Sequence, residues 1–178
     1  MEDNPFSGSR QERELRTYAL LDEIKIPYAR IDHVPAMTME ACEDVDKALG
    51  TRMCKNLFLC NRQQTFFYLL LVPNAKKFRT KNLSAQLGCS RLSFADEEHM
   101  AQLLDIHPGS VSVLGLMNDH GNRVQLLIDE DLLQDEYIGC HPCVNTSSLK
   151  IRLSDILEKF LPAVHHSYRS VALPEDNV

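Results

Sequence analysis

Lys55 and Asn56 open an apolar segment, where a charged and an amide side chain could do chemistry. A lysine at the start of a strand can point into a cleft and hold a phosphate as a compact point charge. The alternative is a lysine whose stem covers apolar surface while its head stays in water. Taken alone, the pair therefore leaves a phosphate site and a solvated surface lysine both open.

The segment PGSVSV, residues 108–113, is a second candidate site. A glycine followed by small residues lets a ligand approach the backbone closely, and exposed amide groups can polarise a carbonyl. The alternative is a turn between a helix and a strand that needs only the flexibility of the glycine. The candidate residues of this loop are Gly109, Ser110, Val111, Ser112 and Val113.

A third candidate is GCHPC, residues 139–143, followed by Asn145. Cys140 and Cys143 have the spacing of a dithiol redox site, although that motif normally opens a helix after an early strand. Structural zinc would need a second, closely spaced ligand pair, and the remaining cysteines are poorly spaced for it. The third option is that His141 hydrogen-bonds a substrate while Pro142 stiffens the loop, and a solvated histidine is the alternative.

The fourth feature is a basic cluster within six positions. It could steer a phosphate backbone to one edge of the protein, or it could be a solvated loop and helix face. Its members are Lys76, Lys77, Arg79 and Lys81.

Composition and net charge limit the classes of function that these residues can have. The 178 residues are 44% apolar and carry a net charge of −6, which fits one folded domain and excludes bulk disorder and a broad nucleic-acid coat. A protein that binds only the end of a nucleic acid is not excluded by this charge. No apolar run reaches membrane-helix length, and the first residues do not resemble a secretory signal, so we expect a cytoplasmic protein.

Hydrophobic periodicity and capping residues predict the elements that position these groups. Helices are expected over 10–25, 39–49 after a Thr38 cap, 81–87 after Thr80, 97–105 after Asp96, and 155–161 after Ser154 or Asp155. Strands are expected over 28–33, 54–61, 65–73, 90–95, 110–117, 124–129, 136–142 and 148–153. The interpretation is one α/β domain around a mixed sheet, residues 10–163, between a flexible leader (1–9) and a partly ordered tail (164–178).

The ordered set of motifs resembles a known family. Lys-Asn opens a strand, a Leu/Val-rich strand and Lys-Lys-Phe-Arg follow, and Pro-Gly-Ser-Val-x-x-x-Gly-Leu-x-Asn-Asp precedes Gly-x-His-Pro-x-x-Asn-Thr. Over about residues 12–162 this resembles the free-standing prolyl-tRNA editing proteins of the YbaK-like group, and most closely the branch that clears alanine from tRNA(Pro). The resemblance implies a mixed, strongly curved sheet and hydrolysis of a mischarged aminoacyl ester at the tRNA 3′ end.

The resemblance also implies residue roles. Lys55 matches the lysine that holds the terminal adenosine phosphate, with Asn56 beside it. Gly109 opens the family's Gly-x-x-x-Pro loop, in which Val113 stands where the family has proline. His141 matches the pocket histidine and Asn145 follows it. The remaining expected substrate contacts are Ser110, Val111, Ser112, Gly139 and Pro142, and the basic cluster is the expected tRNA contact.

The implied mechanism needs no protein nucleophile, metal or cofactor. An aminoacyl ester is already activated, so positioned water and a stabilised oxyanion can suffice. The expected partner is the acceptor 3′ end of tRNA, with prolyl-tRNA synthetase as a second candidate and the oligomeric state left open. Two alternatives remain, namely a non-catalytic aminoacyl-tRNA sensor of the same fold and a Cys-x-x-Cys redox protein.

Overall fold

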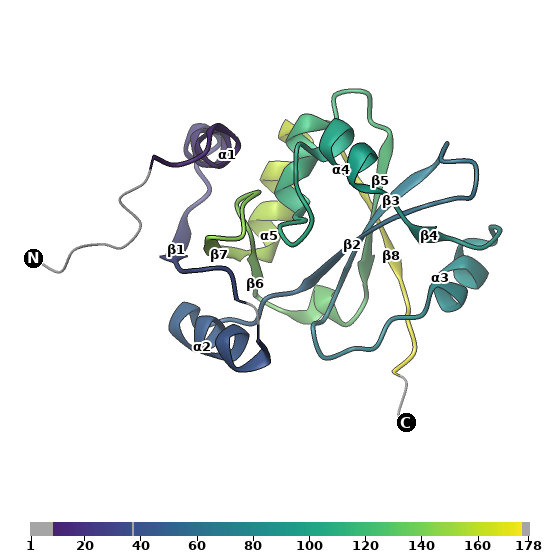
Figure 1. The fold of residues 1–178 in the computed structure, drawn as a ribbon, viewed down its shortest axis with the longest axis horizontal. Helices are drawn as coiled ribbons and strands as arrows, with labels where there is room; N and C mark the ends of the chain where they lie inside the picture. The colour runs from purple at the N-terminus through teal and green to yellow at the C-terminus, as the bar shows by residue number, and fades with distance from the viewer. Residues whose placement is uncertain (1–8, 37, 176–178) are drawn as a thin grey trace, which may run out of the picture.

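The computed structural model describes residues 9–36 and 38–175, which form an α/β fold with two β-sheets (Figure 1). The first sheet is antiparallel, with the order β1 (Tyr28–Asp32), β7 (Ser147–Arg152), β6 (Tyr137–Cys140). The second has the order β4 (Ser93–Phe94), β2 (Lys55–Cys60), β3 (Phe67–Val72), β5 (Val124–Asp129), β8 (Tyr168–Val171). Apart from Ser9, the expected leader lies outside the described residues.

The five-stranded sheet is mixed and is buried on both faces. β2 and β3 form the predicted antiparallel hairpin, whereas β3–β5 and β5–β8 are parallel pairs. Alternate residues of β3 enter different clusters, because Leu69 and Leu71 belong to the larger core and Leu70 and Val72 to a smaller one. This alternation explains the continuous apolar run of the strand and confirms its prediction as a centrally buried element.

The two sheets meet where the chain enters β2. Met53 bridges Gly139, Gly139 N donates to Arg52 O (3.1 Å), and Cys54 N donates to Gly139 O (3.1 Å). A Cβ atom on Gly139 would lie 2.9 Å from Arg52 O, so a residue with a side chain would not fit. The single mixed sheet expected from the sequence is therefore two sheets joined by this bridge.

Four helices surround the sheets much as predicted: α1 (Glu12–Glu23), α2 (Met39–Leu49), α3 (Thr80–Leu87) and α4 (Glu97–Leu104). The side chain of Thr38 caps α2 and that of Asp96 caps α4, because each accepts a backbone N–H of the first turn. Thr80 is the first residue of α3 rather than its cap, a position held by Arg79. Gly50 and Gly88 end α2 and α3 in the left-handed conformation.

The predicted strand over 110–117 is wrong. Val113–Asn118 form a 3-10 helix, and Ser112 Oγ caps it by accepting from Leu114 N (3.2 Å). Gly115 packs so closely that a Cβ there would lie 2.6 Å from Ile106 Cδ1. The alternating pattern of apolar residues here reflects burial of a tight helical turn. β5 therefore has no partner strand at 110–117 and pairs with β3 and β8.

The C-terminal region contains elements that the sequence did not predict, and residues 176–178 of the expected tail lie outside the described residues. A continuous helical segment runs through α5 (Leu153–Asp155), a π-helical turn (Ile156–Phe160) and α6 (Leu161–Ala163), so it begins before the predicted Ser154 or Asp155 cap. The expected tail, 164–178, contains β8, which pairs in parallel with β5. A further 3-10 turn spans Leu132–Gln134. Within the described ranges, no helix is both long and apolar enough to cross a membrane.

Candidate active site

A cavity of about 310 Å³ lies where α2, the start of β2 and the β6–β7 loop meet. It brings together residues from segments far apart in the sequence, among them sequence candidates from three of the four motifs. Its lining consists of His33, Pro35, Ala36, Cys42, Val45, Asp46, Met53, Cys54, Asn56, Asn74, Gly109, Val111, His141, Asn145 and Ser148. Enclosed cavities that combine apolar walls with a few polar groups are the usual form of small-ligand sites.

Two histidine rings, those of His33 and His141, line this cavity with their centroids 6.4 Å apart and their planes tilted by 50°. His141 Nδ1 lies 2.9 Å from Ser147 O, and His33 Nδ1 lies 2.7 Å from Val34 O. Since a carbonyl oxygen only accepts, Nδ1 carries the hydrogen in both rings. In the neutral rings Nε2 is then an acceptor, and that of His33 accepts from Ser148 Oγ at 2.8 Å.

The surroundings of His141 favour its neutral form. Burial lowers the pKa of His141 below its ordinary value of 6.5, and the nearby His33 lowers it further, against the opposing hydrogen bond to Ser147 O. Among the described residues, His141 Nε2 has no hydrogen-bond partner. The ring therefore offers one free acceptor to whatever enters the cavity.

The contacts of its amide nitrogen with Cys54 fix the orientation of the Asn56 side chain. Nδ2 donates to Cys54 O (3.3 Å) and lies 3.5 Å from Cys54 Sγ, so the reverse orientation would place oxygen against a carbonyl oxygen. This leaves Asn56 Oδ1 buried without a partner within the part of the chain that the structure describes. A buried unpartnered oxygen in a cavity wall is an acceptor for a ligand.

The glycine loop contributes only part of its expected contacts. Gly109 adopts φ 88°, which favours glycine, and both Gly109 and Val111 line the cavity. Ser110 instead bonds His107 O, and Ser112 caps the 3-10 helix. Val113, where the resemblance implies proline, is fully buried in the core and does not line the cavity.

Lys55 is not placed in the cavity, contrary to the expectation that it points into a cleft. Its Nζ donates to Lys76 O at 2.7 Å, on the opposite side of β2 from Asn56. No carboxylate lies within ion-pair distance of Lys55 among the described residues. The ammonium group is half-buried beside the site and retains donors for an anion outside the cavity.

The basic cluster divides into two environments. Lys76 is buried, and its Nζ contacts Asp129 Oδ2 (2.6 Å), Asp131 Oδ2 (2.7 Å) and Leu173 O (2.9 Å). The expectation that Lys76 contacts tRNA is therefore wrong in its geometry, because the charge is already neutralised inside the protein. Lys77, Arg79 and Lys81 are exposed.

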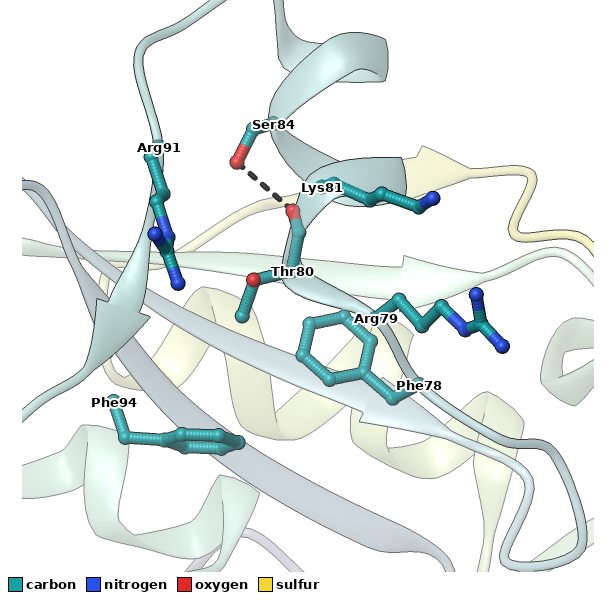
Figure 2. A pocket seen from close by; sticks show the side chains of 7 residues that line it. All are labelled: Phe78, Arg79, Thr80, Lys81, Ser84, Arg91 and Phe94. Atoms are coloured by element: carbon teal, nitrogen blue, oxygen red, sulfur yellow. Dashed lines mark hydrogen bonds between the residues drawn. The ribbon is translucent and has the colours of Figure 1, made fainter.

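Arg79 and Lys81 lie on a separate groove of about 820 Å³ formed by α3, the segment before it and β4. Figure 2 shows Arg91 on one side of Thr80 and Arg79 and Lys81 on the other, with the rings of Phe78 and Phe94 beside them. Phe94 is 61% exposed and meets Phe78 edge to face, with centroids 6.4 Å apart. Sequence reasoning missed Arg91 and Phe94, although the alternation in SRLSF could have indicated them.

The Cys-His-Pro-Cys segment does not form a reactive dithiol. Cys140 and Cys143 are free and buried, and burial raises the pKa of both thiols, that of Cys143 to about 11. Reactive cysteines need the opposite shift. Gly139 and Pro142 support the segment but do not line the cavity, and no cluster suited to a metal ion occurs among the described His, Cys, Asp and Glu residues.

Several lining residues were not predicted from the sequence. His33, Asp46, Asn74 and Ser148 reach the cavity from α2 and from loops and strands whose contacts depend on tertiary structure. A histidine or serine at the end of a strand carries no distinctive spacing. Only the meeting of β1, β7 and the β2 entry brings them beside His141.

Comparison with known proteins agrees with this fold. A solved structure of a proposed trans-editing enzyme for prolyl-tRNA synthetase superposes with a TM-score of 0.69 at 16% identity, covering 94% of this chain and 99% of that one. The protein APE2540 superposes with a TM-score of 0.65 at 13% identity, covering 89% of this chain and 98% of that one.

Sequence relatives include the prolyl-tRNA editing protein ProX of Acetoanaerobium sticklandii, 32% identical over 87% of this chain and 94% of the relative. The prolyl-tRNA synthetase associated domain-containing protein 1 of Danio rerio is 28% identical over 83% of this chain and 80% of the relative. The aminoacyl-tRNA editing domain matches residues 33–159. The chain therefore belongs to the aminoacyl-tRNA editing family, whose activity is hydrolysis of the ester bond of mischarged aminoacyl-tRNA.

Proposed function

We propose that this protein hydrolyses mischarged tRNA(Pro) in trans, and that alanyl-tRNA(Pro) is its main substrate. The observation that carries the proposal is the 310 Å³ cavity in which the Gly109 loop, Asn56 and His141 meet. Its size suits a small aminoacyl group, and the names of the relatives point to prolyl-tRNA as the nucleic acid. Prolyl-tRNA synthetase would supply the substrate in the cytoplasm.

In this proposal the reacting ester enters the cavity while the RNA stays outside. The main chain near Gly109 polarises the ester carbonyl. Gly109 is exposed and has φ 88°, so the carbonyl can approach its backbone closely. His141 Nε2 accepts a hydrogen from the terminal ribose or from the attacking water. The vicinal ribose hydroxyl of the substrate assists the water, so no protein nucleophile is required.

Lys55 anchors the terminal phosphate at the edge of the site. Its position outside the cavity suits this role, because the terminal phosphate lies beyond the ribose from the aminoacyl group. The bond from Nζ to Lys76 O fixes the direction of the side chain while leaving other N–H groups for the phosphate. This is the role that the family resemblance implies for Lys55, and its half-buried position beside the cavity supports the proposal.

Steric rejection sets the choice of amino acid. The walls around the cavity include Pro35, Ala36, Val45 and Val111, which leave space for a methyl side chain. A single methylene alters binding by only about 1–3 kcal/mol, so cognate proline has to be excluded by collision of its ring. Alanine is the favoured substrate and serine the next.

The groove beside α3 is the proposed contact for the rest of the acceptor arm. Arg79, Lys81 and Arg91 supply positive charge, and the two phenylalanine rings supply stacking surface (Figure 2). Lys76 is buried and is not one of the proposed tRNA contacts, whereas Arg91 lines the groove and is one. Binding of this kind weakens as salt rises, because bound counterions are released when phosphates are neutralised.

A deacylation panel with alanine, serine, cysteine and proline on tRNA(Pro) tests the proposal. Alanine should be released fastest and proline should stay attached. Lys55→Ala should raise KM for alanyl-tRNA(Pro) by roughly tenfold, the value of one charged contact. Tight tRNA binding without hydrolysis of any ester would instead indicate a sensor, and equal rates for wild type and Lys55→Ala would remove Lys55 from the site.

A further inference from the structure

A partly buried ion cluster lies where the chain before α1 meets β1 and the start of β7. The Arg10 guanidinium contacts Asp32 through two nitrogens, at 3.0 Å and 2.7 Å, and Glu14 through one of them at 2.5 Å. The Glu14 carboxylate is buried and also accepts from Tyr18 OH at 2.6 Å. The contact with Arg10 lowers the pKa of Asp32 to about 2, so this carboxylate stays charged.

The cluster holds the first residue of β7. Ser147 is buried, and its Oγ lies 2.6 Å from Asp32 Oδ1, 3.1 Å from Glu14 Oε1 and 3.4 Å from Arg10 Nη1. A hydroxyl has one hydrogen, and the shorter contact assigns it to Asp32. Asp32 and Ser147 are also register partners in the β1–β7 pair. The side chain and the backbone of Ser147 are therefore held by the same neighbour.

The Ser147–Ser148 step of β7 serves both histidines of the cavity. Ser147 O accepts from His141 Nδ1 at 2.9 Å, and Ser148 Oγ donates to His33 Nε2 at 2.8 Å. Successive residues of a strand point to opposite faces, so the side chain of Ser147 faces the cluster while that of Ser148 lines the cavity. On the neighbouring strand, Asp32 is followed directly by His33. The cluster thus lies one residue away from the cavity wall on both strands.

The charged members of the cluster belong to the part of the chain that the family match leaves out. Arg10, Glu14 and Asp32 all precede residues 33–159, which match the aminoacyl-tRNA editing domain. An exposed ion pair adds little to stability, whereas a network that fixes one acceptor determines which nitrogen of a histidine carries the hydrogen. Support of His141 is therefore a more specific role for the cluster than stabilisation of the surface.

We propose that Arg10 and Asp32 are positioning residues that act through Ser147 to orient His141 and to keep its hydrogen on Nδ1. The inference rests on the proposed function, in which the free Nε2 of His141 takes part in ester hydrolysis. If the Ser147 carbonyl turned away, the ring would lose the partner that holds the hydrogen on Nδ1, and the hydrogen would be free to move to Nε2. His141 would then present a donor where the reaction needs an acceptor.

The first measurement reads the tautomer of His141 without substrate. Isotope-labelled histidine gives different nitrogen chemical shifts for the Nδ1–H and Nε2–H forms, and His141→Asn identifies the signals of this ring. The wild type should show the Nδ1–H form. In Arg10→Ala an Nε2–H population should appear, because Ser147 loses its support. Arg16→Ala is the matched control, since Arg16 lies on α1 and pairs with Asp105 instead of the cluster.

Hydrolysis of alanyl-tRNA(Pro) is the second measurement. Arg10→Ala should lower kcat by at least about tenfold with little change in KM, because a misplaced reacting group affects the chemical step. The Arg10 side chain is 29% exposed, so free guanidinium at low concentration should enter the vacated site and restore part of the loss, whereas sodium chloride should not. Arg10→Lys keeps the charge without the two-pronged contact and should lie between wild type and Arg10→Ala.

The two readouts separate this inference from the proposed function. An unchanged His141 tautomer in Arg10→Ala would overturn the positioning role, and so would an equal change in Arg16→Ala, because the effect would then be a general loss of stability. Arg10→Lys decides the same question if the alanine variant does not fold. A tautomer that changes only in the Arg10 variants, in a protein that hydrolyses no ester, would overturn the proposed function and leave the positioning of His141 standing.

Discussion

The cavity and the α3 groove differ in charge although they are joined by one short segment of chain. The cavity offers acceptors and the carboxylate of Asp46, whereas the groove offers Arg79, Lys81 and Arg91 beside two aromatic rings. In the proposed function the aminoacyl group enters the cavity, while the phosphates of the acceptor arm lie along the groove. A net charge of −6 is compatible with the proposed RNA binding because the basic residues proposed to serve it lie together on one rim.

The turn between β3 and α3 connects the two regions. Asn74 lines the cavity and Phe78 lines the groove, and between them Lys76 fixes the turn to the buried Asp129 and to the chain after β8. Lys76 O also holds Lys55. A buried ion cluster therefore sets the relation between the two regions.

The largest effect is expected from Lys76→Met. Removing the ammonium leaves Asp129 buried and uncompensated, which should lower the free energy of unfolding by about 3–5 kcal/mol. Urea denaturation measures this, with the exposed Lys81→Met as the matched control at less than about 0.5 kcal/mol. Equal stabilities for the two variants would contradict the structural role of Lys76.

His141→Ala should lower kcat/KM for alanyl-tRNA(Pro) by about 100-fold, the usual loss when a group that positions a proton is removed. The same loss is expected on the small ester alanyl-adenosine, since the cavity acts on the part that both substrates share. Single-turnover deacylation of both substrates measures it. A defect confined to the tRNA substrate would move His141 from the cavity chemistry to RNA binding.

The pH profile should report the neutral form of His141. Because its pKa lies below 6.5 in the folded protein, the acceptor is retained through that pH and is lost only as the pH falls through the lower value. We therefore expect the acid limb of kcat/KM below pH 6.5. Replacing the neighbouring His33 with asparagine removes a cause of the shift, so the limb should move upward; an unchanged limb would assign it to another group.

Arg91→Ala should act on the groove alone. We expect about a fivefold higher KM for alanyl-tRNA(Pro), an unchanged kcat, and a salt slope reduced by about one. Lys25→Ala is the matched control and should leave KM unchanged, because Lys25 is an exposed cation that follows α1, and α1 lies far from α3 in Figure 1. A similar rise in KM for both variants would indicate a general effect of net charge and would contradict tRNA binding in the groove.

The smallest effect is expected from Val113→Pro, which introduces the proline that the family resemblance implies at this position. Ser112 already has the extended φ of −150° and ψ of 146° that suit a residue before proline, and position 113 begins a 3-10 helix. Stability should change by less than about 1 kcal/mol, as measured by urea denaturation. A loss of several kcal/mol would show that the valine has a packing role of its own.

The sequence predicted most elements whose signals are local. The Thr38 and Asp96 caps, the β2–β3 hairpin and the glycine ends of α2 and α3 each depend on neighbouring residues, and the structure confirms them. The failures depend on tertiary contacts with other elements. β8 is stabilised by β5, about 40 residues away in the chain, and the 3-10 helix after Ser112 by packing against Leu104 and Ile106.

The site was predictable to a similar extent. Asn56, Gly109, His141 and Asn145 were marked by motifs and share the cavity. Lys55 was marked by its place at the start of a strand and by the family resemblance, and Lys76 by its basic cluster. Neither signal reveals that Lys55 bonds a carbonyl and that Lys76 is buried between carboxylates. His33, Asp46 and Ser148 could be found only once the two sheets were in place.

The most direct test of the division of roles between the cavity and the α3 groove measures kcat/KM for two variants on two substrates. Asn56→Leu for the cavity and Arg91→Ala for the groove are each assayed on alanyl-tRNA(Pro) and on alanyl-adenosine, which lacks the acceptor arm. The account predicts that Asn56→Leu impairs both substrates by a similar factor, while Arg91→Ala impairs only the tRNA substrate. Equal impairment of alanyl-adenosine by the two variants, or of neither substrate by Asn56→Leu, would contradict it.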